Sequence, residues 1–311
     1  MSVMATPRSQ LVDSETPLFY HLTTRCVRGS WLCGQDPRTG KNYDHRKSWV
    51  KQGLFTLARS FAIELYGYAI MSNHFHLIVR FDPGAARRWT NEEVVDRWLN
   101  CCTAINRANA MEAGFIRELK REQFLSQPEQ IQRLRNTLGS LSMFMKHLKQ
   151  PIARRANRED NCKGHFFESR FYSGALLDEP AALHALAYVD LNPVRAKIVR
   201  RAADAVHTSL RHRLRAAAGS VERLAEYLTP LVSGLEDAED KEPHRLPLTL
   251  AAYLEYLEQF SEDSETPVDE VAVWYQRVAI FRHRQRAFGS LANLSQWAKQ
   301  RGWSRIGRPC S

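Results

Sequence analysis

Several features that mark common protein classes are missing from this 311-residue chain. Its six cysteines include no Cys-x-x-Cys pair and show no disulfide spacing, so we expect reduced thiols and no zinc finger or zinc ribbon. None of its segments approaches the roughly 20 apolar residues of a membrane helix. Residues 1–17 hold no apolar core of signal-peptide length. We therefore expect a soluble, cytoplasmic protein that begins with a flexible segment.

Charge is distributed unevenly along the chain. The formal net charge is +10, and residues 271–311 contain no Asp or Glu, whereas acids dominate residues 236–270. A basic surface favours polyanions such as nucleic acid, although excess charge can also serve solubility alone. We predict a flexible lead-in at 1–17, a main domain at 18–232, an acidic linker region with a helix at 233–270, and a basic helical tail at 271–311. For the tail, a DNA contact and a merely solvated helix pair both remain open.

Hydrophobic periodicity predicts a mixed α/β fold. Two apolar runs on either side of Ser72-Asn73 indicate a β-hairpin. Thr90 and Glu93 have the spacing of a capping box at the start of a helix. Pro151 is expected to kink or end the helix that contains it. The expected elements are strands at 18–27, 65–71 and 74–80, helices at 44–64, 90–100, 128–155 (interrupted near Gly139) and 180–188, and a short strand within 164–179.

The His74-Phe75-His76 triplet opens the second strand of the predicted hairpin. Because residues two apart in a strand point to the same face, both imidazoles can reach one metal ion. A pair of ordinary histidines on a half-exposed sheet is the alternative, and for a motif this short it is favoured when the motif is considered alone.

The segment Ala187–Ala196 (AYVDLNPVRA) holds a second candidate group. Tyr188 and Asn192 lie four residues apart and share a face if the helix continues that far. Asn192 and Pro193 are also a typical helix start, with Asn192 as the N-cap, which would engage its side chain with a backbone N–H. Taken alone, Tyr188 is more often a packed aromatic residue than a nucleophile.

Basic and aromatic residues alternate between Arg154 and Tyr172. Cations suit phosphates, and aromatic faces suit unstacked bases. A loop that packs its aromatics beneath a solvated charged rim explains the pattern equally well. The members of this pattern are Arg154, Arg155, Lys163, His165, Phe166, Phe167, Arg170 and Tyr172.

Four segments in order resemble the REP-associated tyrosine transposases, a branch of the single-tyrosine HUH transposases. They are YHLTTR (20–25), YAIMSNHFHLIVR (68–80), GHFFESRFYSGALLDE (164–179) and AYVDLNPVRAKIV (187–199). The resemblance implies an α/β domain with a ferredoxin-like antiparallel sheet and a helical C-terminal extension. The family often has Gly-Arg-Phe-Trp-Glu-Gly-Arg-Phe at residues 164–171, where this chain has His165 and Phe167. That difference bears on DNA contacts and leaves the other motifs intact.

The resemblance also implies roles for individual residues. His74 and His76 would bind Mg²⁺ or Mn²⁺, with Asn192 at the position of the third ligand, which is glutamine in related small insertion-sequence transposases. Tyr188 would attack single-stranded DNA near a REP hairpin, giving a 5′-phosphotyrosine and a free 3′-OH. The covalent bond conserves the energy for rejoining, in agreement with the absence of a P-loop. We predict DNA contacts for Arg25, Arg154, Arg155, Lys163, His165, Arg170, Tyr172, Arg195, Arg282, Arg284 and Arg286.

Two other functions remain open at this stage. A metal-dependent nuclease could cut DNA without a covalent intermediate, leaving Tyr188 structural. A domesticated protein could bind REP hairpins without cutting them. The sequence also leaves open whether the chain acts as a monomer or a homodimer.

Overall fold

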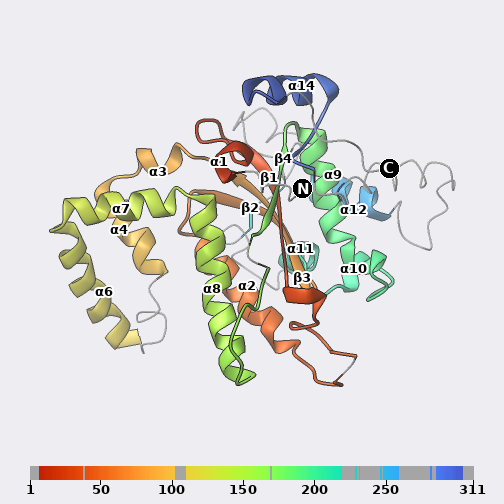
Figure 1. Ribbon diagram of the computed structural model, residues 1–311, viewed down its shortest axis with the longest axis horizontal. Coiled ribbons are helices and arrows are strands. Elements are labelled where there is room, and N and C mark those ends of the chain that lie inside the picture. Colours follow the sequence, from red (N-terminus) through yellow and green to blue (C-terminus); the bar gives the residue numbers. More distant parts are fainter. Residues whose placement is uncertain are drawn as a thin grey trace, which may run out of the picture.

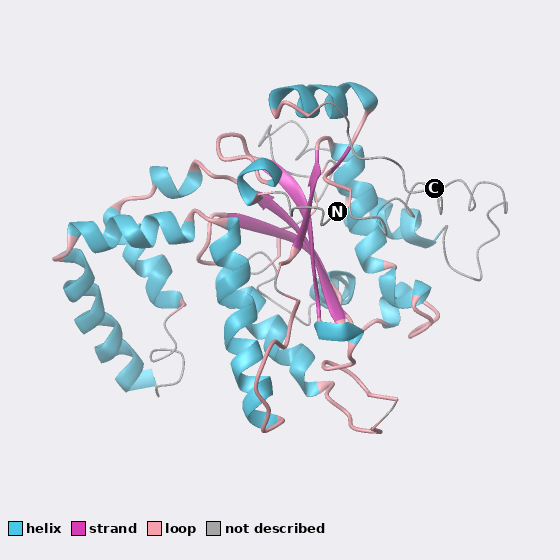
Figure 2. Ribbon diagram, in the orientation of Figure 1, coloured by secondary structure: helices cyan, strands magenta, loops and turns pink. Residues whose placement is uncertain are grey.

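A five-stranded sheet in the order β2-β3-β1-β4-β5 organises the part of the chain that the structure describes. The structure is a computed structural model, and it describes residues 7–37, 39–101, 110–168, 170–218, 228–229, 231, 246, 248–258, 281 and 285–303. Figures 1 and 2 show the strands at the centre with helices on both sides. The strands are β1 (Leu18–Arg25), β2 (Ile63–Ile70), β3 (His74–Phe81), β4 (Tyr172–Leu176) and β5 (Ala287–Phe288).

The first four strands have the ferredoxin-like arrangement. β3 pairs antiparallel with both β1 and β2, and β1 pairs antiparallel with β4. Helix α2 (His45–Ala58) connects β1 to β2, and a series of helices ending with α8 (Leu141–Glu159) connects β3 to β4. The predicted mixed α/β fold with an antiparallel sheet is therefore confirmed. β5, from the predicted basic tail, adds a parallel edge strand next to β4.

The remaining described helices surround this sheet. No helix in the described part of the chain has the length and apolar character that a membrane crossing needs. The remaining described helices are α1 (Arg8–Leu11), η1 (Val27–Gly29), α3 (Ala85–Arg88), α4 (Asn91–Asn100), α6 (Ala110–Leu125), α7 (Pro128–Leu138), α9 (Glu179–Asp190), α10 (Asn192–Arg195), η2 (Ala202–Asp204), α11 (Ser209–Ala217), α12 (Leu250–Glu258) and α14 (Leu291–Gln300).

Local sequence signals explain several helix starts. The predicted capping box is present, since Thr90 Oγ1 accepts from the Glu93 N–H at 3.2 Å and Glu93 Oε2 accepts from the Thr90 N–H at 2.6 Å. Asp178 caps α9 by accepting from the Ala181 N–H at 3.0 Å. Ser290 caps α14 in the same way, with its hydroxyl accepting from Asn293 at 3.3 Å. Each bond satisfies one of the N–H groups that a helix start leaves without a partner.

Two predicted helix boundaries are wrong. The helix predicted at 44–64 ends at Ala58, because Ile63 and Glu64 already pair with β3. The long basic helix is interrupted at Gly139 as predicted, but α8 then continues through Pro151 to Glu159. Proline inside a helix costs about 3 kcal/mol. Burial of Leu148, Ile152 and Ala156 on one stripe offsets that cost.

Each face of the sheet has its own hydrophobic cluster. Phe75, Leu77 and Val79 of β3 point to the face that α2 and α8 cover, whereas Ile78 points to the face that α9 covers. Figure 1 shows α8 and α2 on one side of the sheet and α9 on the other. The strand alternation therefore assigns His74 and His76 to the face beneath α9.

Gly67 allows α9 to lie close against β2. A Cβ atom at this position would lie 2.4 Å from Leu186 Cδ1 of α9. We expect Gly67→Ala to lower the free energy of unfolding by about 1–3 kcal/mol through overpacking. Gly114→Ala in α6 is the control, since nothing lies within 4 Å of a Cβ there. Urea denaturation of both variants measures the difference, and equal stability would show that the contact with Leu186 can be relieved at little cost.

Candidate active site beneath helix α9

The pairing of β1 with β3 brings three histidines onto one face of the sheet. Thr23 lies opposite His76 and Arg25 lies opposite His74, so their side chains share a face with His21. The rings of His74 and His76 are 4.8 Å apart, and those of His21 and His76 are 5.1 Å apart and nearly parallel. The common face predicted for the His74/His76 pair is thus present.

All three imidazoles lie in a setting that favours the neutral form. Burial, the main cause, lowers the pKa of His74 to about 4 and that of His21 to about 3, and it lowers the pKa of His76 well below its usual value. The positive charge of Arg25 contributes to the lowered pKa of both His74 and His76. Neutral imidazoles each keep one lone pair, which metal coordination requires.

The lowered pKa values make stability depend on pH. Unfolded histidines, with a pKa near 6.5, bind protons between pH 6.5 and 4, whereas His21, His74 and His76 in the folded chain do not. Stability therefore falls as the pH is lowered through this range. Urea denaturation in the presence of a chelator should show the fall, and His74→Gln should reduce its slope. An unchanged slope in that variant would contradict the neutral state of His74.

Helix α9 places Tyr188 above the histidines. Its ring centroid is 5.5 Å from that of His76 and 5.7 Å from that of His21. The Arg195 guanidinium lies 5.0 Å from the Tyr188 ring centroid. Tyr188 is 6% exposed, and the ring of Phe281 packs against it with centroids 5.8 Å apart. Residues more than a hundred positions apart in the sequence therefore meet at one point.

The structure distinguishes the two interpretations of Asn192. Leu191 occupies the N-cap position of α10, and Asn192 makes no capping hydrogen bond, so the capping interpretation is wrong. Instead, Asn192 Nδ2 lies 3.2 Å from His76 Nε2. Tyr188 and Asn192 lie on the same side of the chain, as their four-residue spacing predicts. Binding of a metal by Asn192 stays a prediction.

A buried carboxylate fixes the end of α9, and sequence reasoning did not identify it. Asp190 Oδ1 accepts from Ser209 Oγ at 2.7 Å and from the Leu210 N–H at 3.1 Å, and Tyr253 Oη donates to Oδ2 at 2.8 Å. Burial raises the pKa of Asp190. These bonds join α9 to α11 and α12 only two residues beyond Tyr188. No local signal marked Asp190, because its partners come from distant segments.

His21 and Thr23 were also missed. His21 Nε2 lies 2.9 Å from His76 Nδ1, and Thr23 Oγ1 lies 3.0 Å from the same atom. A signal was available in the sequence, since His21, Thr23 and Arg25 alternate along one strand and must share a face. What the sequence could not supply was the register that sets this strand beside His76.

The residues predicted to contact DNA fall into separate groups. Arg25 is exposed opposite His74, and Arg195 lies beside Tyr188. Tyr172 is on the same face, where its hydroxyl donates to the Gln285 carbonyl and its ring is 5.9 Å from His21. Arg286 lies over the Trp303 ring at 4.7 Å. Arg282 and Arg284 lie outside the described residues.

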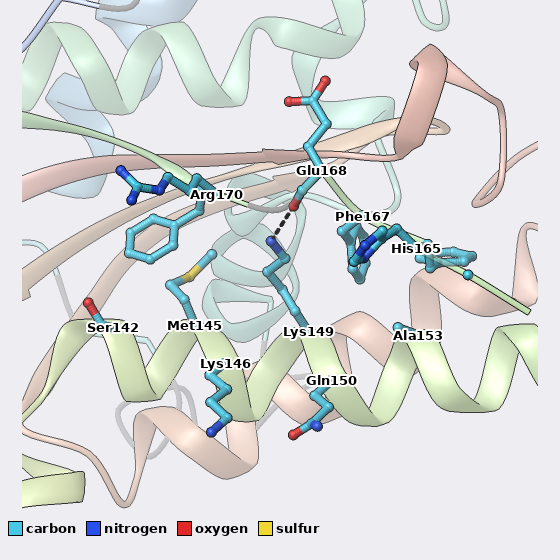
Figure 3. A pocket seen from close by; sticks show the side chains of 13 residues that line it. Ser142, Met145, Lys146, Lys149, Gln150, Ala153, His165, Phe167, Glu168 and Arg170 are labelled. Carbon is cyan, nitrogen blue, oxygen red and sulfur yellow. Dashed lines mark hydrogen bonds between the residues drawn. The ribbon is translucent and has the colours of Figure 1, made fainter. Parts of the chain in front are cut away.

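The other predicted DNA contacts lie on the α8 side of the sheet. His165 and Arg170 line a cavity of about 550 Å³ between α8 and residues 164–168 and 170–171, which Figure 3 shows from close by. In that view Lys149 donates to the Glu168 carbonyl at 2.9 Å, and the Glu168 carboxylate points away from the cavity. Arg154 and Arg155 line a second cavity of about 710 Å³. Arg155 lies 3.8 Å from the Trp49 ring centroid, and Lys163 is exposed.

The donor atoms at the site fit a divalent ion bound by few protein ligands. Among the described residues, no three His, Cys, Asp or Glu side chains are arranged to hold a metal. An ion here would rest on His74 and His76 and on oxygens from water or substrate, and the Asn192 amide, whose nitrogen faces His76 Nε2, would have to turn its oxygen toward the ion to be a ligand. Imidazole donors suit Mn²⁺ better than Mg²⁺, which prefers oxygen ligands.

Comparison with known proteins adds little to this geometry. No family model matches the chain, and no curated protein matches it. The chain is similar to a solved structure of a REP-associated tyrosine transposase bound to a REP hairpin, with 13% identity and a TM-score of 0.40, over 71% of this chain and 88% of that one. A likeness this distant assigns neither a family nor a function.

Proposed function

We propose that the chain is a transposase that cleaves and rejoins single-stranded DNA near REP-type hairpins through a 5′-phosphotyrosine at Tyr188, with a divalent metal held by His74 and His76. The observation that carries the proposal is the position of Tyr188 over His76, whose ring lies 4.8 Å from that of His74. The Tyr188 ring is 5.5 Å from His76, and the Asn192 amide contacts the same imidazole at 3.2 Å.

Cleavage and rejoining need no external energy source, because each step exchanges one phosphate ester bond for another. Tyr188 Oη attacks the scissile phosphorus, the bond from phosphorus to the 3′-oxygen breaks, and the phenolic proton leaves, so that the products are a 5′-phosphotyrosine and a 3′-OH. Attack of a 3′-OH on the phosphotyrosine reverses the step and releases Tyr188. A free phenol has a pKa of about 10, so the proton must be lost during attack.

The residues around Tyr188 support this chemistry. Arg195, with its guanidinium 5.0 Å from the ring centroid, stabilises negative charge that develops on the phenol oxygen. Arg25, exposed opposite His74, attracts the phosphate backbone to the same face. A bound divalent ion would supply Lewis acidity toward an oxygen of the scissile phosphate. His74, His76 and Asn192 would hold it.

A hairpin oligonucleotide with a labelled 5′ overhang tests the proposal. Incubation with the full chain and Mn²⁺ should give a protein–DNA adduct on a denaturing gel, and mass spectrometry should locate the adduct on the peptide that contains Tyr188. Omitting Mn²⁺ and adding a chelator should prevent its formation. Cleavage that leaves no adduct would instead support a metal-dependent nuclease in which Tyr188 is structural.

One observation favours a second candidate function. Tyr188 is only 6% exposed and Phe281 packs against it, as expected for a protein that binds hairpin DNA without cutting it. Hairpin binding with no cleavage under Mg²⁺, Mn²⁺ or any other divalent ion would support this candidate and contradict the first.

The exposed cations near α8 give a separate prediction about binding. We expect Arg154→Glu combined with Lys163→Glu to weaken hairpin binding and to reduce the slope of log Kd against log salt by about 1–2. Each phosphate contact that is lost lowers the number of counterions that DNA releases when the protein binds. Arg133→Glu on α7 is the control, since Arg133 is also exposed but belongs to another helix. Titrations at several salt concentrations measure both. Equal slopes for all the variants would exclude the α8 surface as a DNA contact.

A further inference from the structure

The two nitrogens of the His76 imidazole have different partners, and these determine where its proton lies. Nε2 lies 3.2 Å from Asn192 Nδ2. With the Asn192 amide in this orientation its nitrogen donates and Nε2 of His76 accepts, which places the ring proton on Nδ1. Nδ1 in turn lies 2.9 Å from His21 Nε2 and 3.0 Å from Thr23 Oγ1.

The same reasoning fixes the tautomer of His21. If His76 Nδ1–H donates to His21, then His21 Nε2 carries a lone pair. If it donates to Thr23 instead, a proton on His21 Nε2 would still face the His76 Nδ1–H across only 2.9 Å, so His21 Nε2 again carries a lone pair. In both arrangements the proton of His21 is on Nδ1.

The proton on Nδ1 of His21 lowers the stability of the folded chain. Nδ1 of His21 is buried and has no hydrogen-bond partner among the described residues. A buried donor without a partner costs about 1–3 kcal/mol. An apolar side chain would fill this position without that cost, so packing alone does not account for a histidine here. The contact of His21 with His76 accounts for the histidine.

Neighbouring rings hold the His21 imidazole in place. It lies nearly parallel to the His76 ring, with 20° between the planes, and the rings of Tyr172 and Phe281 meet it edge-on at 5.9 Å and 6.0 Å. The side chain is 1% exposed, so water does not replace it as an acceptor. His21 therefore presents its Nε2 lone pair to His76 in a fixed geometry.

We infer that His21 is a positioning residue that accepts the hydrogen bond of His76 Nδ1 and so keeps the Nε2 lone pair of His76 directed at the metal site. The inference deepens the proposed function and rests on it for the identity of the ligand. Partners of this kind orient metal-binding imidazoles and are commonly responsible for about 10–100-fold in metal affinity.

The first test uses the metal-free full chain and does not depend on the proposed function. Long-range ¹H–¹⁵N NMR of ¹⁵N-histidine-labelled protein distinguishes a protonated ring nitrogen from one with a lone pair, and His76→Gln assigns the His76 signals. We expect a protonated Nδ1 and an unprotonated Nε2 in wild type. A proton on Nε2 of His76 would overturn the inference.

Matched substitutions of His21 provide the second test. His21→Phe keeps a ring but removes the acceptor, whereas His21→Gln places an amide oxygen near the former Nε2. We expect the Phe variant to mix the His76 tautomers and to weaken Mn²⁺ binding, measured by electron paramagnetic resonance of the free ion, by about 10–100-fold. The Gln variant should recover most of this loss. Thr24→Val, at the next position of β1 and on the opposite face of the sheet, should change the affinity by less than about 3-fold.

The outcomes separate the inference from the function on which it rests. A folded His21→Phe protein with wild-type tautomer and Mn²⁺ affinity overturns the inference. Should His21→Phe fail to fold, the His76 tautomer in the wild-type spectrum and the Mn²⁺ affinity of His21→Gln test the inference instead. If wild type binds no Mn²⁺ but His21→Phe still alters the His76 tautomer, the positioning contact stands and the proposed metal-dependent function fails.

Discussion

The variant Tyr188→Phe is expected to form no covalent DNA adduct and to cleave hairpin DNA at least about 10³-fold more slowly than wild type. The change removes one oxygen atom and leaves the ring in its contacts with His76, His21 and Phe281. The fold should therefore be unchanged, and the affinity for hairpin DNA should stay within a factor of about 2, because neither depends on the hydroxyl group. Denaturing gels of labelled oligonucleotide measure the adduct, and gel shifts measure binding.

Tyr256→Phe is the matched control for this experiment. Tyr256 also has a ring packed against a histidine, His184, but it lies on α12. Its adduct yield should equal that of wild type. Persistence of the adduct in Tyr188→Phe would show that another residue is the nucleophile, and a loss in both variants would indicate damage to the fold.

The second large effect is expected for His76→Ala. His76 is 4% exposed and contacts Asn192, His21 and Thr23 through its two nitrogens, so its removal takes away one proposed metal ligand and the contact of a second. We expect loss of Mn²⁺ binding and a decrease of at least about 10²-fold in metal-dependent cleavage. Calorimetric titration with Mn²⁺ and the hairpin assay measure the two quantities.

His165→Ala serves as the control for metal binding. His165 is exposed on the α8 side of the sheet and should leave Mn²⁺ affinity unchanged. Thermal unfolding of His76→Ala must also be recorded, because the substitution leaves a cavity beneath α9. A folded His76→Ala protein that binds Mn²⁺ as wild type does would remove His76 from the metal site.

Local sequence patterns determined much of the fold. Alternation along β3 placed His74 and His76 on one face and Phe75 and Leu77 on the other. The Thr90 and Glu93 capping box set the start of α4, and the Ser72-Asn73 turn set the hairpin. These features involve neighbours within a few residues, so short-range steric and hydrogen-bonding rules suffice to predict them.

Local patterns failed where distant contacts decide between nearly equal conformations. The pair Asn192-Pro193 is compatible with a helix cap and with a continuous turn, and the contact with His76 Nε2 accompanies the second. Pro151 alone would end a helix, but buried Leu148 and Ile152 keep α8 intact on both sides of it. In both places tertiary packing outweighed a local preference of a few kcal/mol.

The sequence by itself determined the identity of the candidate site: two histidines on one face of a strand, and a tyrosine four residues before an asparagine. Only the tertiary structure decided that these groups meet, because the register of β1 against β3 and the packing of α9 on Gly67 involve residues far apart in the chain. The same contacts revealed His21 as the partner of His76 and Asp190 as the anchor of α9. A strand pattern tells which face a side chain occupies, but not which other strand lies beside it.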